Sequence, residues 1–214
     1  MRDCVGRLID GGFDGIILVA ANPVDLMTLA ALRASGFDPA RVIGSGTLLD
    51  TSRLHQALAR KLLVAASSIE GFVLGEHGDT ELAALSTVRI GGLTLEAFCS
   101  ESGLILDRTA LAAEVRDAGY GIVQGKGYSP FGVATALVRI CEAIARDEQA
   151  VLPVSTLLTG QYGVADLCLS LPCVLGADGI ERVLLPKLDP GENAAFAASA
   201  AALRFAWDAV APRH

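Results

Sequence analysis

The chain has 214 residues, a formal net charge of −7 at pH 7 and an isoelectric point of about 4.9. Such an acidic chain lacks the basic face that nucleic-acid binding requires, so we expect no nucleic-acid partner. Mean hydropathy is +0.48, yet the longest apolar run, Gly15–Ala21, is too short to span a bilayer.

The first residues and the cysteines indicate the compartment. Arg2, Asp3, Arg7 and Asp10 break any apolar stretch at the amino terminus, which is therefore not a secretory signal. The five cysteines are scattered and form no Cys-x-x-Cys pair, as expected of free thiols in a reducing compartment. We expect a cytoplasmic protein that does not enter the membrane.

The amino-terminal elements alternate between strand and helix. After a helix over residues 1–10, the all-apolar run Gly15–Ala21 predicts a strand of a parallel sheet covered on both faces. A helix over Val24–Ser35 and a short strand over Arg41–Gly44 follow. Strand, helix and strand in this order predict a parallel crossover unit.

The remainder predicts a mixed arrangement. A helix should run from Asp50 to Leu62, with Asp50 or Thr51 as its N-cap. Strands should cover Gly71–Leu74 and Ala84–Val88. Further elements are expected in chain order: helices over 107–124 and 131–147, a β-rich stretch over 151–185, and a terminal helix from Pro190 to Trp207.

These elements predict a domain boundary. A dinucleotide-binding domain has six strands, and residues 1–48 supply two. The cluster Gly44–Leu49 lacks the third glycine of a pyrophosphate-binding loop. We therefore predict an α/β Rossmann remnant, its last two strands, over residues 1–48. Residues 49–214 should form an α+β catalytic domain.

Two motifs carry chemistry. Asp50, Thr51, Ser52 and Arg53 precede the run Gly75–Asp79, which contains His77. A histidine can donate a proton to a carbonyl oxygen, a carboxylate can orient that histidine, and a guanidinium can hold a substrate carboxylate. These groups suit the reduction of a 2-keto acid. The alternatives are a surface-loop histidine, an N-cap at Asp50 and a surface salt bridge from Arg53.

The flanking text resembles a known family. Val19–Asp25, Gly44–Arg53 and Gly75–Glu81 resemble the NAD-dependent L-lactate dehydrogenases, with L-2-hydroxyisocaproate and malate dehydrogenases as relatives. The resemblance covers Arg2 to Ala211 and only the later part of the family pattern. It implies interconversion of (S)-lactate and pyruvate with NAD. The alternatives are an L-2-hydroxyisocaproate or malate dehydrogenase, or an inactive truncated remnant.

The resemblance also implies residue roles. His77 would donate and accept the proton, Asp50 would hold its tautomer, and Arg53 would bind the substrate carboxylate. Further substrate contacts would come from Asn22, Asp25 and Ser129. The family usually has a threonine at the position of Ser129. Asn22 has the alternative of an Asx turn. The implied cofactor contacts are Ala20, Ala21, Asn22, Ser45 and Val133. The family also implies a homotetramer.

Three further expectations concern ligands. Glu76, His77 and Asp79 are too close in one loop to converge on an ion, so we expect no metal. Family members activated by fructose-1,6-bisphosphate carry an arginine and a histidine where this chain has His55 and Glu70, so activation is not expected. Without a pyrophosphate loop, the chain alone should bind NADH poorly and show no turnover.

Overall fold

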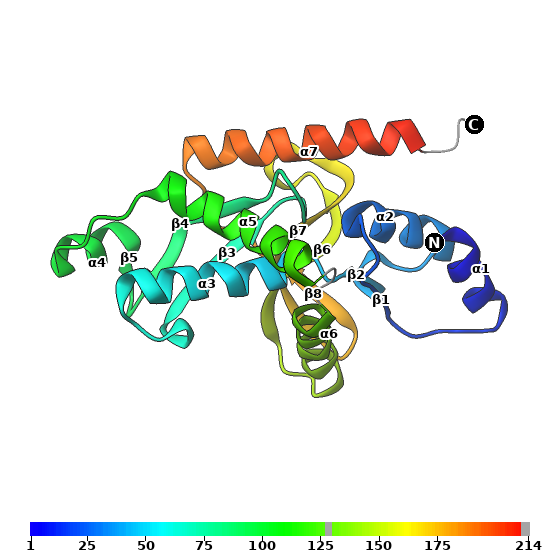
Figure 1. The fold of residues 1–214 in the computed structure, drawn as a ribbon. Coiled ribbons are helices and arrows are strands. Elements are labelled where there is room, and N and C mark those ends of the chain that lie inside the picture. The colour runs from blue at the N-terminus through cyan, green and yellow to red at the C-terminus, as the bar shows by residue number, and fades with distance from the viewer. Residues whose placement is uncertain (127–129, 211–214) are drawn as a thin grey trace.

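The computed structural model describes the backbone of residues 1–126 and 130–210, in two sheets with helices around them (Figure 1). The helices are α1 (Arg2–Asp10), α2 (Val24–Ser35), α3 (Leu48–Leu62), α4 (Leu95–Ser102), α5 (Arg108–Lys126), α6 (Pro130–Ala145) and α7 (Pro190–Val210). The strands are β1 (Ile17–Val19), β2 (Val42–Gly44), β3 (Ile69–Leu74), β4 (Leu82–Ile90), β5 (Leu93–Thr94), β6 (Ala150–Thr159), β7 (Ala165–Gly176) and β8 (Gly179–Val183).

The larger sheet joins the beginning of the chain to its end. Its order is β1-β2-β6-β7-β8, in which β1 and β2 are parallel and the other neighbours are antiparallel. Gly44 of β2 lies opposite Ser155 of β6, and a Cβ on Gly44 would lie 2.8 Å from the Cβ of Ser155. Glycine is thus required where the two strands approach. The predicted parallel pair is confirmed, and the domain boundary after residue 48 stays a prediction.

The smaller sheet, β3-β4-β5, packs against α3 and α5. Leu54 and Leu58 of α3 are fully buried against Val73 of β3, Val88 of β4 and Leu111 of α5. A backbone bridge between Gly75 and Ser170 of β7 ties the end of β3 to the larger sheet. The loop after β3 therefore lies where the two sheets meet.

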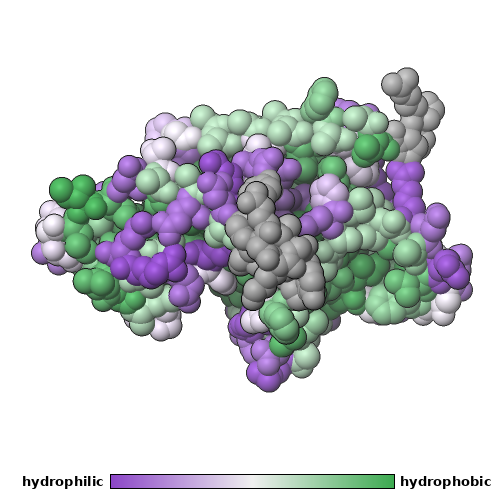
Figure 2. Space-filling model, in the orientation of Figure 1, coloured by the Kyte–Doolittle hydropathy of each residue, from purple (hydrophilic) through white to green (hydrophobic). Residues whose placement is uncertain are grey.

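Helix α7 runs along one side of the molecule, and α6 projects from the opposite side (Figure 1). Phe196, Leu203 and Trp207 on α7 are buried against residues that include Leu169 of β7 and Leu29 of α2. The outer side of α7 forms the pale hydrophobic band along the upper edge of Figure 2. Exposed alanines contribute to it, namely Ala194, Ala195, Ala197, Ala198, Ala201 and Ala202.

The positive mean hydropathy of the chain does not come from a membrane-spanning helix among the described residues. Among the helices of residues 1–126 and 130–210, none is both long and apolar enough to cross a bilayer.

Helix α3 differs from its prediction. It begins at Leu48 with Thr47 at the N-cap, so the predicted cap at Asp50 or Thr51 is wrong. The hydroxyl of Thr47 donates to the carbonyl oxygen of Val73 at 2.5 Å, and that of Thr51 accepts from the Val73 amide at 2.9 Å. These side chains thus fix the first turn of α3 to β3.

Two more differences are local. The strand predicted over Gly15–Ala21 is confined to Ile17–Val19, because β2 offers a ladder of only three residues. Strand β5 and helix α4 were not predicted. Helix α4 is capped by Thr94, whose hydroxyl accepts a hydrogen bond from the Ala97 amide.

Phe196→Ala should destabilise the chain strongly, because Phe196 is fully buried and packs on Tyr162 with ring centroids 5.0 Å apart. Loss of a buried phenylalanine costs about 3–5 kcal/mol of the free energy of unfolding. Phe205→Ala on the same helix is the control, because Phe205 is 80% exposed. Urea unfolding should separate the two variants. Equal losses would show that α7 does not pack as described.

Candidate active site

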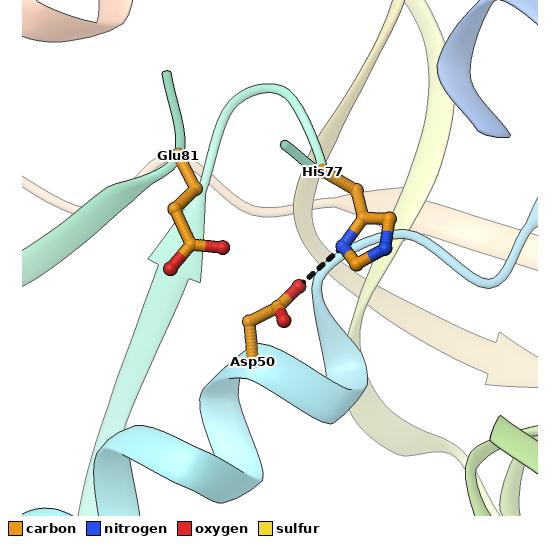
Figure 3. Close-up of side chains that lie close together, drawn as sticks. All are labelled: Asp50, His77 and Glu81. Atoms are coloured by element: carbon orange, nitrogen blue, oxygen red, sulfur yellow. Dashed lines mark hydrogen bonds and ion pairs between the residues drawn. The ribbon is translucent and has the colours of Figure 1, made fainter. Parts of the chain in front are cut away.

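The buried carboxylate of Asp50 lies in the first turn of α3 and is 1% exposed. Its Oδ1 accepts a hydrogen bond from Nη1 of Arg53 at 2.7 Å. Its Oδ2 lies 2.6 Å from Nδ1 of His77 (Figure 3). One carboxylate therefore holds both the imidazole and the guanidinium that the sequence singled out.

The loop that carries His77 is fixed at its first residues. Gly75 exchanges two backbone hydrogen bonds with Ser170 of β7, at 3.0 and 2.9 Å. The amide of Glu76 donates to Oγ of Ser199 on α7 at 3.0 Å. Gly75 has φ 84°, and a Cβ there would lie 3.0 Å from Oγ of Ser199. The positive φ favours glycine at this position, and a side chain would also crowd Ser199.

A second buried carboxylate, Asp25 of α2, holds His77 itself. Its Oδ2 accepts from the backbone amide of His77 at 2.8 Å, and its Oδ1 accepts from the hydroxyl of Ser155 on β6 at 2.5 Å. Asp25 is 1% exposed. Both of its oxygens face protein donors, so this position does not favour the substrate contact that was expected of Asp25.

These contacts set the ionisation of the site. The hydrogen bond to Asp50 is the largest cause that raises the pKa of His77 above its ordinary 6.5. Burial raises the pKa of Glu81 to about 8, and the negative charge of Asp50 adds to this effect. The site therefore shifts both groups toward their protonated forms, His77 through its hydrogen bond to Asp50 and Glu81 through burial.

The ring of His77 turns its two nitrogens in different directions. Nδ1 faces Asp50, and the other ring nitrogen, Nε2, points away from it (Figure 3). The His77 side chain is 26% exposed and that of Arg53 is 17% exposed. The imidazole and the guanidinium are thus both partly exposed, and they can serve a carbonyl oxygen and a carboxylate of one small molecule.

Asp50, His77 and Glu81 could in principle also hold a cation. Their ligand atoms lie within 4.8 Å of one another, and the carboxylate of Glu81 extends toward the same space (Figure 3). This group differs from the one considered in the sequence, because Glu81 replaces Glu76 and Asp79. Both oxygens of Asp50 already face Arg53 and His77. We therefore describe the cluster as an ion-pair site rather than a metal centre.

The residues expected at the cofactor lie mainly at the ends of two parallel strands. Ala20, Ala21 and Asn22 follow β1 and are exposed, whereas Ser45 follows β2 and is half-buried. The Ser45 amide donates to the carbonyl oxygen of Val19 at 2.9 Å, which joins the two strand ends. Small exposed side chains at the carboxyl ends of parallel strands fit the nicotinamide end of a dinucleotide.

Two more expected residues belong to the segment around the start of α6. Val133 lies in the first turn of α6 and is 37% exposed. Ser129 lies outside the described residues.

Residues 47–211 match the model of the lactate/malate dehydrogenase alpha/beta C-terminal domain. The chain belongs to the lactate/malate dehydrogenase family. It is 44% identical over 204 residues to an L-lactate dehydrogenase of Treponema denticola, covering 94% of this chain and 65% of that protein. It is 46% identical over 205 residues to L-lactate dehydrogenase 1 of Lactococcus lactis subsp. cremoris, covering 95% and 63%. The chain thus spans somewhat less than two thirds of these curated relatives.

Solved structures agree with this family membership. The minor L-lactate dehydrogenase from Enterococcus mundtii, in its ligands-bound form, superposes with a TM-score of 0.95 at 37% identity. This match covers 99% of the present chain and 68% of that structure. The two-sheet arrangement described above is therefore the family fold.

Four residues of the site escaped the sequence analysis. Glu81 was quoted within the motif but given no role. Ser155 stands in a buried strand with Thr156, and two adjacent polar residues in such a strand could have indicated a function. Ser199 is the one serine in the alanine-rich helix α7, whereas Ser170 in β7 carried no comparable signal.

A rise in pH should lower the free energy of unfolding of this chain through the titration of His77 and Glu81. In the folded chain His77 and Glu81 hold their protons to higher pH than in the unfolded chain. The folded state then binds more protons, and the free energy of unfolding falls as pH rises from about 5 to 8. Glu81→Gln removes one of these protonations. The variant should melt above wild type at pH 8, with a gap that shrinks toward pH 5.

Differential scanning fluorimetry across this pH range measures the effect. Glu101→Gln is the matched control, because Glu101 is exposed at the end of α4 and should follow the wild-type curve. Parallel curves for wild type and Glu81→Gln would contradict the assigned burial of Glu81.

Proposed function

We propose that this chain carries the catalytic part of an NAD-dependent L-lactate dehydrogenase that interconverts (S)-lactate and pyruvate. The observation that supports this most is the single Asp50 carboxylate shared by His77 and Arg53. The reaction needs a proton donor and a carboxylate-binding cation close together, and this pairing supplies both. The relatives named as L-lactate dehydrogenases favour lactate over the malate and L-2-hydroxyisocaproate alternatives.

His77 is the proposed proton donor and acceptor. Asp50 accepts from Nδ1, so a neutral ring keeps its proton on Nδ1 and leaves Nε2 as the base. In pyruvate reduction the imidazolium donates from Nε2 to the carbonyl oxygen. In lactate oxidation the neutral ring takes the hydroxyl proton back. The raised pKa of His77 favours the imidazolium, which reduction requires.

Arg53 is the proposed carboxylate clamp. Its guanidinium has five N–H donors in a fixed plane, and the contact with Asp50 engages Nη1. The remaining donors can form two parallel hydrogen bonds with a substrate carboxylate. Because Asp50 fixes both Arg53 and His77, the carboxylate and the carbonyl of one 2-keto acid are held in a set relation.

NAD, when bound, supplies or accepts the hydride. We propose that Ala20, Ala21, Asn22, Ser45 and Val133 hold its nicotinamide end. Asn22 would also contact the substrate carbonyl, and Ser129 the substrate side chain. We further propose a cytoplasmic homotetramer. The exposed Phe205 and Ile105, at 80% and 101%, are consistent with subunit contacts.

His77→Asn should abolish most of the turnover. The assay joins the chain to the part of the Treponema denticola relative that the match does not cover, and follows NADH oxidation by pyruvate. Loss of a general acid–base group lowers turnover by about 10²–10⁴-fold. His55→Asn on α3 is the matched control and should keep wild-type turnover. Near-wild-type turnover in His77→Asn would refute the proton-donor role.

Arg53→Lys should raise the KM for pyruvate strongly and leave the affinity for NADH almost unchanged. Lysine keeps the charge, but it lacks the planar fork that binds a carboxylate through two hydrogen bonds. Steady-state kinetics with each substrate varied in turn measure both effects. Equal weakening of both ligands would assign Arg53 a structural role.

Fructose-1,6-bisphosphate should not activate the enzyme. Glu70 is exposed and negatively charged, and Nε2 of His55 is engaged with the carbonyl oxygen of Gly71 at 2.9 Å. Neither side chain suits a dianionic phosphate. Titration of activity against the bisphosphate at neutral pH checks this, and saturable activation would refute it.

A further inference from the structure

A buried polar chain connects the larger sheet to the backbone of His77. It runs from the hydroxyl of Ser155 on β6, through the carboxylate of Asp25 on α2, to the amide of His77. Ser155 is 0% exposed and Asp25 is 1% exposed. The partners lie 130 and 52 residues apart in sequence from Asp25, so the folded structure alone brings them together.

A carboxylate in this place carries a cost. Burial raises the pKa of Asp25 to about 6, and the hydrogen bonds from Ser155 and His77 offset this only in part. Above that pH the folded chain must hold a buried negative charge that the unfolded chain exposes to water. The free energy of unfolding therefore falls as pH rises from about 4 to 6. The presence of a carboxylate at this position is therefore not explained by a gain in stability.

We propose that Asp25 is a positioning residue, which fixes the catalytic histidine through its main-chain amide while Ser155 fixes the carboxylate of Asp25. The inference rests on the proposed role of His77 as proton donor. Asp50 holds the ring of His77 and Asp25 holds its backbone, from two different helices. The imidazole is thereby fixed at two points, and its distance to a bound carbonyl oxygen is set.

The charge of Asp25 adds a second effect, because it favours the protonated form of His77. Other charged groups act on the same ring or on its neighbours. They are Asp50 and Arg53 on α3, Glu76 in the loop, Glu81 after it, and Arg116 on α5, which acts on Glu81. Changing Asp25 alone leaves all of these in place.

The test compares four variants of the full chain by NMR: Asp25→Asn, Asp25→Ala, Ser155→Ala and Thr28→Val. Hydrogen exchange of the His77 amide reports on the backbone contact, and titration of the ring reports on the charge. Thr28→Val is the matched control. Thr28 is as buried as Asp25 and on the same helix, but its hydroxyl donates to the carbonyl oxygen of Val24.

Asp25→Ala should speed exchange of the His77 amide by roughly ten- to a hundredfold, because a hydrogen bond to a charged acceptor is lost. Ser155→Ala should speed it less. Asp25→Asn should keep the amide protected, because its oxygen can accept from His77 and its NH₂ can donate to Ser155. Its His77 ring should nevertheless titrate at lower pH than in wild type. Thr28→Val should change neither quantity.

The melting temperature of Asp25→Asn can still be measured if Asp25→Ala fails to fold. At pH 8 this variant should melt above wild type, because the buried charge is gone. A lower melting temperature would assign the carboxylate a stabilising role and overturn the proposal. Wild-type exchange in Ser155→Ala and Asp25→Ala, or an unshifted ring titration in Asp25→Asn, would also overturn it.

Amide exchange, ring titration and melting of the chain can all be measured without enzymatic turnover. The positioning role of Asp25 can therefore be tested independently of the proposed function. In the joined enzyme used above, Asp25→Asn should lower kcat and leave the KM for pyruvate near wild type. If the joined wild-type enzyme shows no turnover with pyruvate, the proposed function fails while the positioning contact is still measured.

Discussion

The buried carboxylate of Asp50 is the constraint on which the site depends. A buried anion is tolerated only with good partners, and Asp50 has Arg53 on one oxygen and His77 on the other. Its position follows from the first turn of α3, which two threonine hydroxyls fix to Val73 of β3. The packing of α3 on the smaller sheet thus decides where the imidazole and the guanidinium stand.

The loop of His77 adds the second constraint, because it lies where both sheets and two helices meet. Gly75 pairs with β7, the amide of Glu76 binds Ser199 of α7, and the amide of His77 binds Asp25 of α2. Each contact gives a partner to a backbone group of this partly buried loop. A short loop held at successive amides presents its side chain with little freedom, which is what proton transfer at a set distance requires.

Sequence reasoning succeeded where a signal is local. The bounds of α2 were predicted as observed, since Pro23 and Gly36 mark its ends. The motif text singled out Asp50, Arg53 and His77, which the structure brings together, while their catalytic roles stay predictions. It failed where tertiary contacts decide. Asp50 resembles an N-cap in sequence, but its carboxylate is committed to His77. Ser155 and Ser199 lie far from His77 along the chain, so no spacing rule could connect them to it.

The most direct test of this account is the protonation state of the His77 ring, read by ¹⁵N NMR across a pH titration of the full chain. The spectrum of His77→Asn identifies the signals. Because Asp50 accepts from Nδ1, the neutral ring should carry its proton on Nδ1, and its pKa should lie above the ordinary 6.5. A neutral ring protonated on Nε2, with a pKa at or below 6.5, would contradict the central role of Asp50.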